Sequence, residues 1–359
     1  MSKKKLYQLA VQQVRKSTAD SVLVTLKVPQ DLHEAFAFRA GQYLTLETEI
    51  GGEVVRRTYS LCAAPQDRLW RVGIKRLEGG LFSTFANERL KAGDTLSVMP
   101  PKGRFGVNPD PQTPKNYLAF AAGSGITPIF AIIKTQLFSE PDCTFKLFFV
   151  NRGPASIMLK EEIEALKNRF MTRLEVYHFF TREAREAPFF NGRIDREKLE
   201  TIFARLSEIE NIHDFFICGP EDFTVLIRDF LTDNQVEAGQ IHMELFGTNR
   251  QPDPQKAPAS IATPANGHCR VTLIDGGKET KFQVPRGSAT LLEASLDLQL
   301  DLPFSCKGGV CSTCRARLLE GKVEMRTNYA LEADELEAGF ILTCQSVPLS
   351  ETITVSFDG

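Results

Sequence analysis

Four cysteines near the C-terminus constrain this chain more than any other feature. They are Cys306, Cys311, Cys314 and Cys344, and their spacing is C-x4-C-x2-C…C. The chain has 359 residues, and no apolar stretch resembling a secretory signal follows its basic N-terminus. In such a chain, clustered thiols indicate metal ligation or redox use rather than disulfide bonds.

This spacing fits two kinds of metal site. It is the spacing of plant-type [2Fe–2S] clusters, in which four thiolates surround two irons. Gly308 and Gly309 favour this interpretation, because glycines let the loop turn tightly and bring backbone N–H groups close to the sulfurs. A structural zinc site is the alternative, since C-x2-C pairs also bind zinc. Zinc sites usually have two such pairs, whereas Cys344 stands alone, and we expect the iron–sulfur cluster.

The residues around the cysteines extend this match. Residues 268–359 resemble a plant-type ferredoxin domain, including Leu302-Pro303-Phe304-Ser305 before the loop and Leu342-Thr343 before Cys344. The resemblance implies a β-grasp fold and a one-electron carrier. The local patterns predict a hairpin over residues 270–284, a helix over 290–298 and a final strand over 352–357.

The rest of the chain divides into three parts. Residues 1–111 alternate in polarity between Gly and Pro turns, which predicts a small β-barrel with strands at 21–26, 42–46, 58–61 and 70–75. Residues 112–247 alternate apolar strands with helical patterns, which predicts an α/β nucleotide-binding domain with a parallel sheet. Residues 248–267 contain four prolines and no aromatic residue, which indicates a linker.

The segment Arg57-Thr58-Tyr59-Ser60 resembles the R-x-Y-[ST] flavin motif of the ferredoxin–NADP reductase superfamily. The resemblance implies that Arg57 pairs with a flavin phosphate, that Tyr59 packs beside the isoalloxazine ring, and that Ser60 hydrogen-bonds near N5. Thr58 completes the motif. An ordinary strand with an exposed arginine is the alternative.

A second segment, from Gly79 to Thr84, resembles the flavin-phosphate segment of the same superfamily. Gly80 would allow close backbone approach, and a helix beginning at Ser83 would direct its N–H groups to the pyrophosphate of FAD. Lys75, on the preceding strand, is expected to assist a phosphate or the adenosine. The alternative is a capped helix with Ser83 as its N-cap.

A dinucleotide loop is expected where Gly123-Ser124-Gly125-Ile126-Thr127-Pro128 follows an apolar strand and opens a helix. Small residues permit the turn, and amides at the helix start can bind a pyrophosphate. Pro128 suits the first helical turn, where its missing N–H is not needed. In the superfamily this segment binds NAD(P), with Thr127 in contact.

Cys218-Gly219-Pro220 resembles the C-G-P motif of the superfamily, which lies where a strand meets the nicotinamide. The resemblance places Cys218 beside the reacting carbon. It also implies that an acidic residue and an aromatic of the segment 242–246 lie near the flavin, with Phe246 over the ring. A buried core cysteine and simple core packing of Phe246 are the alternatives. Arg182 follows a strand at the position where relatives often hold the 2′-phosphate of NADP, and Arg152 follows the strand before it, so we expect NADPH rather than NADH. Solvated surface charges are the alternative for both arginines.

These parts together resemble reductases that serve bacterial oxygenases. The expected path runs from NADPH through FAD and the [2Fe–2S] cluster to an oxygenase component as partner. Reductases of steroid or aromatic-ring hydroxylases share this layout. A zinc-binding scaffold without flavin is the alternative from another functional class. The net charge of −2 gives no indication of nucleic acid binding, and we expect a cytoplasmic protein that does not enter a membrane.

Overall fold

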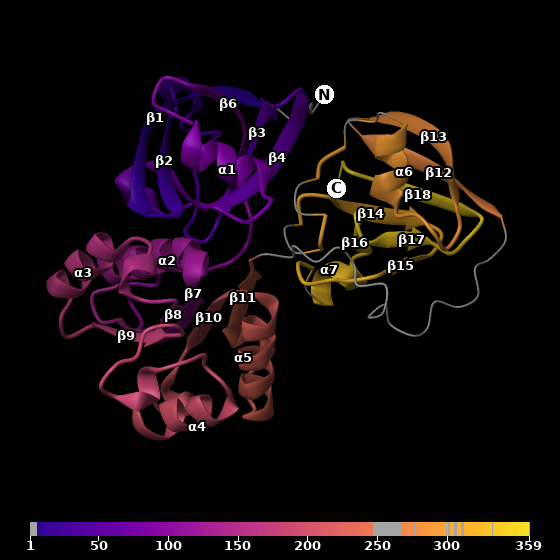
Figure 1. The fold of residues 1–359 in the computed structure, drawn as a ribbon. Helices are drawn as coiled ribbons and strands as arrows, with labels where there is room; N and C mark the ends of the chain where they lie inside the picture. The colour runs from indigo at the N-terminus through magenta and orange to yellow at the C-terminus, as the bar shows by residue number, and fades with distance from the viewer. Residues whose placement is uncertain are drawn as a thin grey trace. The chain divides into compact units, whose positions relative to one another are not determined.

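The computed structural model describes residues 6–246 and 267–358, except 276, 299, 301, 305, 306, 310, 311 and 332. The described residues fall into two compact units, divided at residue 247 (Figure 1). No helix among the described residues is long and apolar enough to cross a membrane.

The first unit begins with a six-stranded antiparallel sheet in the order β4-β3-β6-β1-β2-β5. A bridge between Leu61 and Val72 joins its two ends, which confirms the predicted barrel. Its interior is apolar, and the Trp70 indole donates a hydrogen bond of 2.7 Å to the buried carbonyl of Phe36. The elements are β1 (Tyr7–Thr18), β2 (Ser21–Lys27), β3 (Tyr43–Ile50), β4 (Glu53–Ser60), β5 (Trp70–Lys75), α1 (Leu81–Glu88) and β6 (Thr95–Lys102).

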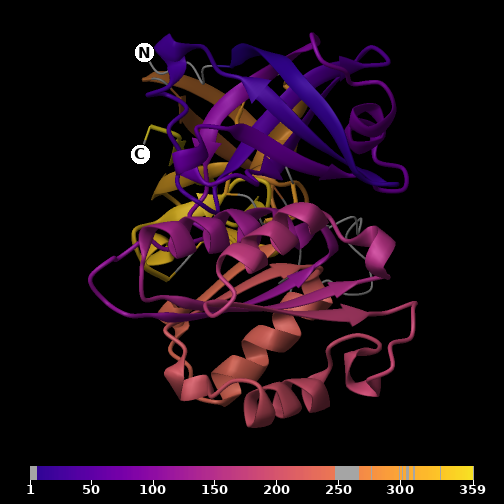
Figure 2. The same ribbon diagram turned by 90° about the vertical axis from the view of Figure 1, so that its left-hand side faces the viewer.

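A five-stranded parallel sheet follows in the same unit, in the order β11-β10-β7-β8-β9. Figure 2 shows α2 and α3 between this sheet and the barrel, and α4 and α5 on the opposite face. The elements are β7 (Asn116–Ala122), α2 (Ile126–Ser139), β8 (Thr144–Asn151), α3 (Lys160–Arg169), β9 (Leu174–Phe180), α4 (Arg196–Arg205), β10 (Asp214–Gly219), α5 (Glu221–Asp233) and β11 (Ile241–Leu245).

Close contacts hold the barrel against the parallel sheet. Gly73 of β5 has no room for a side chain, because a Cβ there would lie 2.6 Å from the Thr127 methyl group. Lys134 of α2 donates to both carboxylate oxygens of Asp67, at 2.7 and 2.8 Å. The first contact holds the start of α2 against β5, and the second holds the middle of α2 against the loop before β5.

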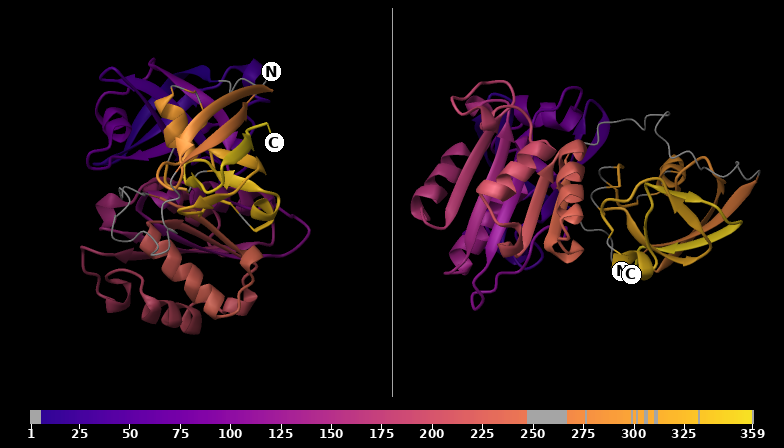
Figure 3. Two further views of the ribbon diagram at one scale, coloured as in Figure 1. Left: turned by 90° about the vertical axis from the view of Figure 1, so that its right-hand side faces the viewer. Right: turned by 90° about the horizontal axis from the view of Figure 1, so that it is seen from below.

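The second unit is a mixed sheet in the order β13-β12-β18-β14-β16, with β12 and β18 parallel and α6 packed on its core (Figure 3). This arrangement confirms the β-grasp prediction. The elements are β12 (His268–Asp275), β13 (Lys278–Pro285), α6 (Leu291–Asp297), β14 (Arg315–Glu320), β15 (Val323–Met325), α7 (Ala333–Glu337), β16 (Phe340–Leu342), β17 (Ser346–Pro348) and β18 (Thr352–Ser356).

Candidate functional site

The first flavin motif occupies the end of β4. The Arg57 guanidinium is exposed and makes no ion pair with a described residue, its one hydrogen bond going to the carbonyl of Arg56 at 2.7 Å. Tyr59 is half-buried, with its ring 5.5 Å from that of Phe82, and Thr58 lies half-buried on the other side of the strand. The motif therefore offers an exposed cation and an aromatic ring on the same face.

Ser60 ends β4 and connects the barrel to the parallel sheet. Its hydroxyl donates to Oε2 of Glu244 on β11 at 3.1 Å, and Glu244 is in register with Cys218 on β10. Burial raises the pKa of Glu244 to about 8, although the bond from Ser60 acts in the opposite direction. Cys218 is fully buried, and burial followed by the nearby Glu244 raises the pKa of its thiol. Three polar groups from both domains thus meet at one junction.

Glu244 is the acidic residue of the segment 242–246, where the resemblance implies an acid near the flavin. It is the only ionisable residue between Met243 and Phe246, within a strand that is otherwise apolar at that end. Its hydrogen bond to Ser60 is the part that the sequence does not predict.

The second flavin segment folds differently from the expectation. The helix α1 begins at Leu81 rather than Ser83, and Gly80 is its N-cap. The Ser83 hydroxyl accepts a hydrogen bond from the Leu77 N–H at 3.1 Å and donates to the Gly80 carbonyl at 3.2 Å. Ser83 therefore neither starts nor caps the helix, because its side chain ties α1 back onto the preceding turn. Thr84 is half-buried one residue further on.

The turn before α1 remains accessible. Gly79 adopts a φ of +70°, which favours glycine, and no atom lies within 4 Å of the position where its Cβ would be. Lys75 lies elsewhere: its Nζ is 3.7 Å from a carboxylate oxygen of Asp20 and 4.0 Å from where a Cβ would lie on Gly123. The ammonium group is thus beside the dinucleotide loop.

The dinucleotide loop forms a short 3-10 turn over Gly123–Gly125 that leads directly into α2. Gly125 is packed so closely that a Cβ would lie 2.1 Å from the carbonyl oxygen of Cys218. The Thr127 hydroxyl donates to the carbonyl of Ser124 at 3.0 Å, and Pro128 is buried in the first turn of α2. The loop is therefore held directly on the end of β10.

The C-G-P segment brings three predicted residues to the same place. Gly219 ends β10, and its carbonyl accepts a hydrogen bond of 2.8 Å from the Phe246 N–H. Pro220 then precedes α5 as its N-cap. Phe246 is half-buried against the core that contains Cys218. Its packing is compatible with both interpretations given to it from the sequence.

The two arginines assigned to the cofactor phosphate lie on adjacent loops. Arg152 follows β8 and Arg182 follows β9, and the Arg182 N–H donates to the carbonyl of Arg152 at 2.9 Å. Both side chains are exposed, and neither makes an ion pair with a described residue. Glu183 lies between these loops, where a Cβ on Gly153 would be 1.9 Å from its carboxylate.

Two of the four predicted cluster ligands, Cys306 and Cys311, lie outside the described residues. The other two, Cys314 and Cys344, are 2% and 6% exposed. The Thr343 N–H and hydroxyl donate to the Cys314 carbonyl at 3.2 and 3.0 Å, which joins the two ligand-bearing segments.

The described part of the loop fits an iron–sulfur cluster. The side-chain Nε2 of Gln345 is 3.7 Å from the sulfur of Cys344 and also donates a hydrogen bond to the Lys307 carbonyl at 2.8 Å. Gly309 has a φ of +75°, and a Cβ there would lie 2.8 Å from the carbonyl of Thr327. Buried thiols, a donor beside sulfur and a loop that requires glycine are what the cluster needs.

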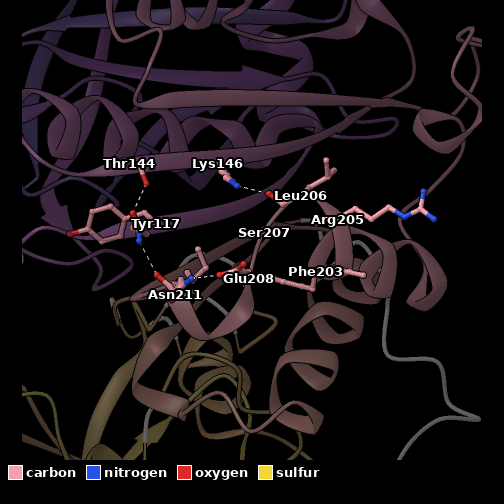
Figure 4. A pocket seen from close by; sticks show the side chains of 12 residues that line it. Tyr117, Thr144, Lys146, Phe203, Arg205, Leu206, Ser207, Glu208 and Asn211 are labelled. Atoms are coloured by element: carbon pink, nitrogen blue, oxygen red, sulfur yellow. Dashed lines mark hydrogen bonds between the residues drawn. The ribbon is translucent and has the colours of Figure 1, made fainter.

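A cavity of about 400 Å³ lies at the amino-terminal ends of β7 and β8, away from the junction (Figure 4). Most of its polar side chains bond to one another or to the backbone. Thr144 donates to the Asn116 side chain at 2.7 Å, Asn116 donates to the Asn211 carbonyl at 3.1 Å, and Lys146 donates to the Leu206 carbonyl. The cavity therefore presents few polar groups to a ligand, unlike the junction at Ser60.

Comparison with known families agrees with this division of the chain. Residues 8–106 match the oxidoreductase FAD-binding domain, residues 120–229 the oxidoreductase NAD-binding domain, and residues 273–349 the 2Fe-2S iron-sulfur cluster binding domain.

Two relatives resemble the chain over almost its full length. A component of 1,2-phenylacetyl-CoA epoxidase from Escherichia coli K12 is 39% identical, and the match covers 98% of each chain. The ferredoxin reductase component of 3-ketosteroid-9-alpha-monooxygenase from Rhodococcus rhodochrous is 32% identical, covering 97% of this chain and 96% of its own. Phthalate dioxygenase reductase has a similar fold, with a TM-score of 0.59 over 98% of both chains at 24% identity.

Proposed function

This chain belongs to the ferredoxin–NADP reductase superfamily, in the group with a C-terminal plant-type [2Fe–2S] domain, and we propose that it is the reductase component of an oxygenase. In this role it passes electrons from NADPH through FAD and the cluster to the oxygenase. Bound FAD would supply the ability to accept a hydride and release its electrons singly.

The contact between Ser60 and Glu244 is the observation that carries this proposal. It joins the end of the flavin motif to the strand beside Cys218, within 3.1 Å. A hydride donor on the parallel sheet and an acceptor on the barrel must approach to about 3–3.5 Å to react. The junction is where the chain brings those two halves together.

Each predicted residue has a proposed part in this arrangement. Arg57 would neutralise a flavin phosphate, and the rings of Tyr59 and Phe246 would pack against the isoalloxazine. Ser60 and Cys218 orient the reacting atoms and exclude water from them. The remaining proposed cofactor contacts are Thr58, Gly80, Ser83 and Thr84 for FAD, Lys75, Gly123, Gly125, Thr127, Pro128, Gly219 and Pro220 for the dinucleotide, and Cys306, Cys311, Cys314 and Cys344 for the cluster.

The choice of NADPH is supported by Arg152 and Arg182. Both guanidinium groups are exposed, unpaired with described residues and on adjacent loops, as a 2′-phosphate requires. We expect Arg182→Ala to raise the KM for NADPH about tenfold and to leave the KM for NADH within twofold. Arg205→Ala, at an exposed arginine on α4, is the matched control. Equal KM changes for both cofactors would contradict the assignment.

The oxygenase we propose is a phenylacetyl-CoA epoxidase, because a component of that enzyme is 39% identical to this chain over 98% of both. A steroid or aromatic-ring hydroxylase is the alternative acceptor, supported by the 32% identity to the 3-ketosteroid monooxygenase reductase component. Turnover with purified oxygenase components of both kinds separates them. Coupled product formation with the epoxidase alone supports the first proposal, and product with the steroid hydroxylase alone supports the second.

The absorption spectrum of anaerobically purified protein tests the electron path itself. Flavin bands and broad [2Fe–2S] absorption that both bleach after stoichiometric NADPH are expected. Protein that lacks both features and contains zinc would overturn the proposal and support a zinc-binding scaffold.

A further inference from the structure

A buried ion pair lies next to the cysteine loop of the second unit. Arg315 directly follows Cys314 and begins β14, and its guanidinium donates to the Glu335 carboxylate on α7. The Glu335 side chain is only 6% exposed, and that of Arg315 is 29% exposed. A carboxylate is therefore almost removed from water, and its partner is adjacent in sequence to a proposed cluster ligand.

The pair is attached to the backbone that carries two of the proposed ligands. Arg315 pairs with Leu342 between β14 and β16. The next residue, Thr343, donates two hydrogen bonds to the carbonyl of Cys314 and is followed by Cys344. The backbone of Arg315 is thus one residue from Cys314, and its cross-strand partner Leu342 is two residues from Cys344.

The position of the guanidinium is also fixed from a second side. Its central carbon lies 4.3 Å from the centre of the Phe340 ring, which stacks on it. Arg317, two residues further along β14, differs: it is exposed, makes no ion pair with a described residue and donates to the Ala338 carbonyl at 3.2 Å. Arg315, which follows Cys314, is therefore ion-paired, whereas Arg317 is exposed to solvent.

Buried ion pairs seldom stabilise a fold relative to apolar residues, so stability alone does not account for this one. We propose that Glu335 keeps the reduction potential of the cluster low by neutralising Arg315. Reduction adds one negative charge to the cluster, and an uncompensated cation nearby would favour the reduced state. The proposal rests on the cluster assigned under the proposed function and extends it to residues that bind no cofactor.

The test measures the cluster potential of the full-length protein by redox titration, followed by the visible absorption of the cluster, with iron content determined for every variant. Glu335→Gln keeps the shape of the side chain but removes its charge. We expect it to shift the equilibrium about tenfold toward the reduced cluster, equivalent to about 59 mV for a one-electron couple. Arg315→Gln should shift it in the opposite direction, and the double variant should return close to the original potential.

Two exposed neighbours provide matched controls. Glu337→Gln on α7 and Arg317→Gln on β14 make the same charge changes where solvent screens them, and both should leave the potential unchanged. Single variants at Arg315 and Glu335 that match the original potential, or that both shift it in the same direction, would overturn the proposal.

The result remains decisive if one variant loses its cluster. If Glu335→Gln retains no iron, Arg315→Gln alone decides, and an unchanged potential there refutes the role of the pair. Original protein that binds no iron would refute the cluster itself, and the iron measurement distinguishes that failure from a failure of the ion pair.

Discussion

Gly125→Ala tests whether the dinucleotide loop must rest directly on β10. A Cβ at this position would lie 2.1 Å from the carbonyl oxygen of Cys218, 2.5 Å from its carbonyl carbon and 3.0 Å from the nitrogen of Gly219. All three atoms are backbone atoms of the strand end, so no side chain can rotate away. The loop, the strand or both must move.

The size of the effect follows from these distances. Ordinary contacts begin at 3.4 Å, so the added methyl group must gain about 1.3 Å from the Cys218 carbonyl. Overpacking of this kind destabilises by about 1–3 kcal/mol, which for a unit of this size lowers Tm by roughly 2–12 °C. A displacement near 1 Å between reacting groups slows a reaction by about 100-fold.

Anaerobic stopped-flow measurement of flavin reduction by NADPH, together with thermal unfolding followed by circular dichroism, measures both effects. Gly239→Ala is the matched control, because Gly239 has a permissive backbone and no atom within 4 Å of the added Cβ. A Gly125→Ala protein with the original reduction rate and Tm would refute the claim that this contact positions the loop.

Two further predictions concern the carboxyl group of Glu244 and the hydrogen bond of Trp70. The pKa of Glu244 in the folded protein is about 8, above its ordinary value of 4.5. The protonated carboxyl therefore stabilises the fold fully below pH 4.5, and this contribution is lost as the pH rises through 8. Glu244→Gln should remove this loss, and Ser60→Ala should move it to higher pH. Thermal unfolding from pH 5 to 9 checks both, and parallel curves for the original protein and Glu244→Gln would contradict them. Trp70→Phe leaves the buried carbonyl of Phe36 unpaired and should destabilise the protein by about 1–3 kcal/mol, measurable by denaturant unfolding, whereas an unchanged midpoint would show that the bond is dispensable.

Regular patterns in the sequence predicted most of the architecture. The strand at 70–75 was placed at its observed bounds, because alternation marks it clearly. The strand β1 (Tyr7–Thr18) was missed because the second half of its sequence is largely polar, so it lacks the alternation that marks a strand. The strand β6 was missed because it contains Pro100 and Pro101, which usually argue against a strand.

The candidate site was predictable where it depends on local motifs. The end of β4 and the loop before α2 have recognisable residues at fixed spacings, and the structure places both at strand ends. The start of α1 was wrong by two residues, because the Ser83 hydroxyl bonds to the preceding turn, a contact that spacing does not reveal. The bond from Ser60 to Glu244 and the ion pair of Glu335 with Arg315 were not predicted, because the partners lie far apart in the sequence.

The hydrogen bond between Ser60 and Glu244 joins residues that are 184 positions apart in the chain. This separation determines how long after Ser60 its partner is synthesised. All six barrel strands are contained in residues 7–102, so the barrel is complete early in synthesis. At ribosomal rates of about 5–20 residues per second, roughly 10–40 s separate the synthesis of Ser60 from that of Glu244. A nascent chain therefore has a barrel before it has the acid that completes the junction, and the finished site can form only when the reductase half has been made.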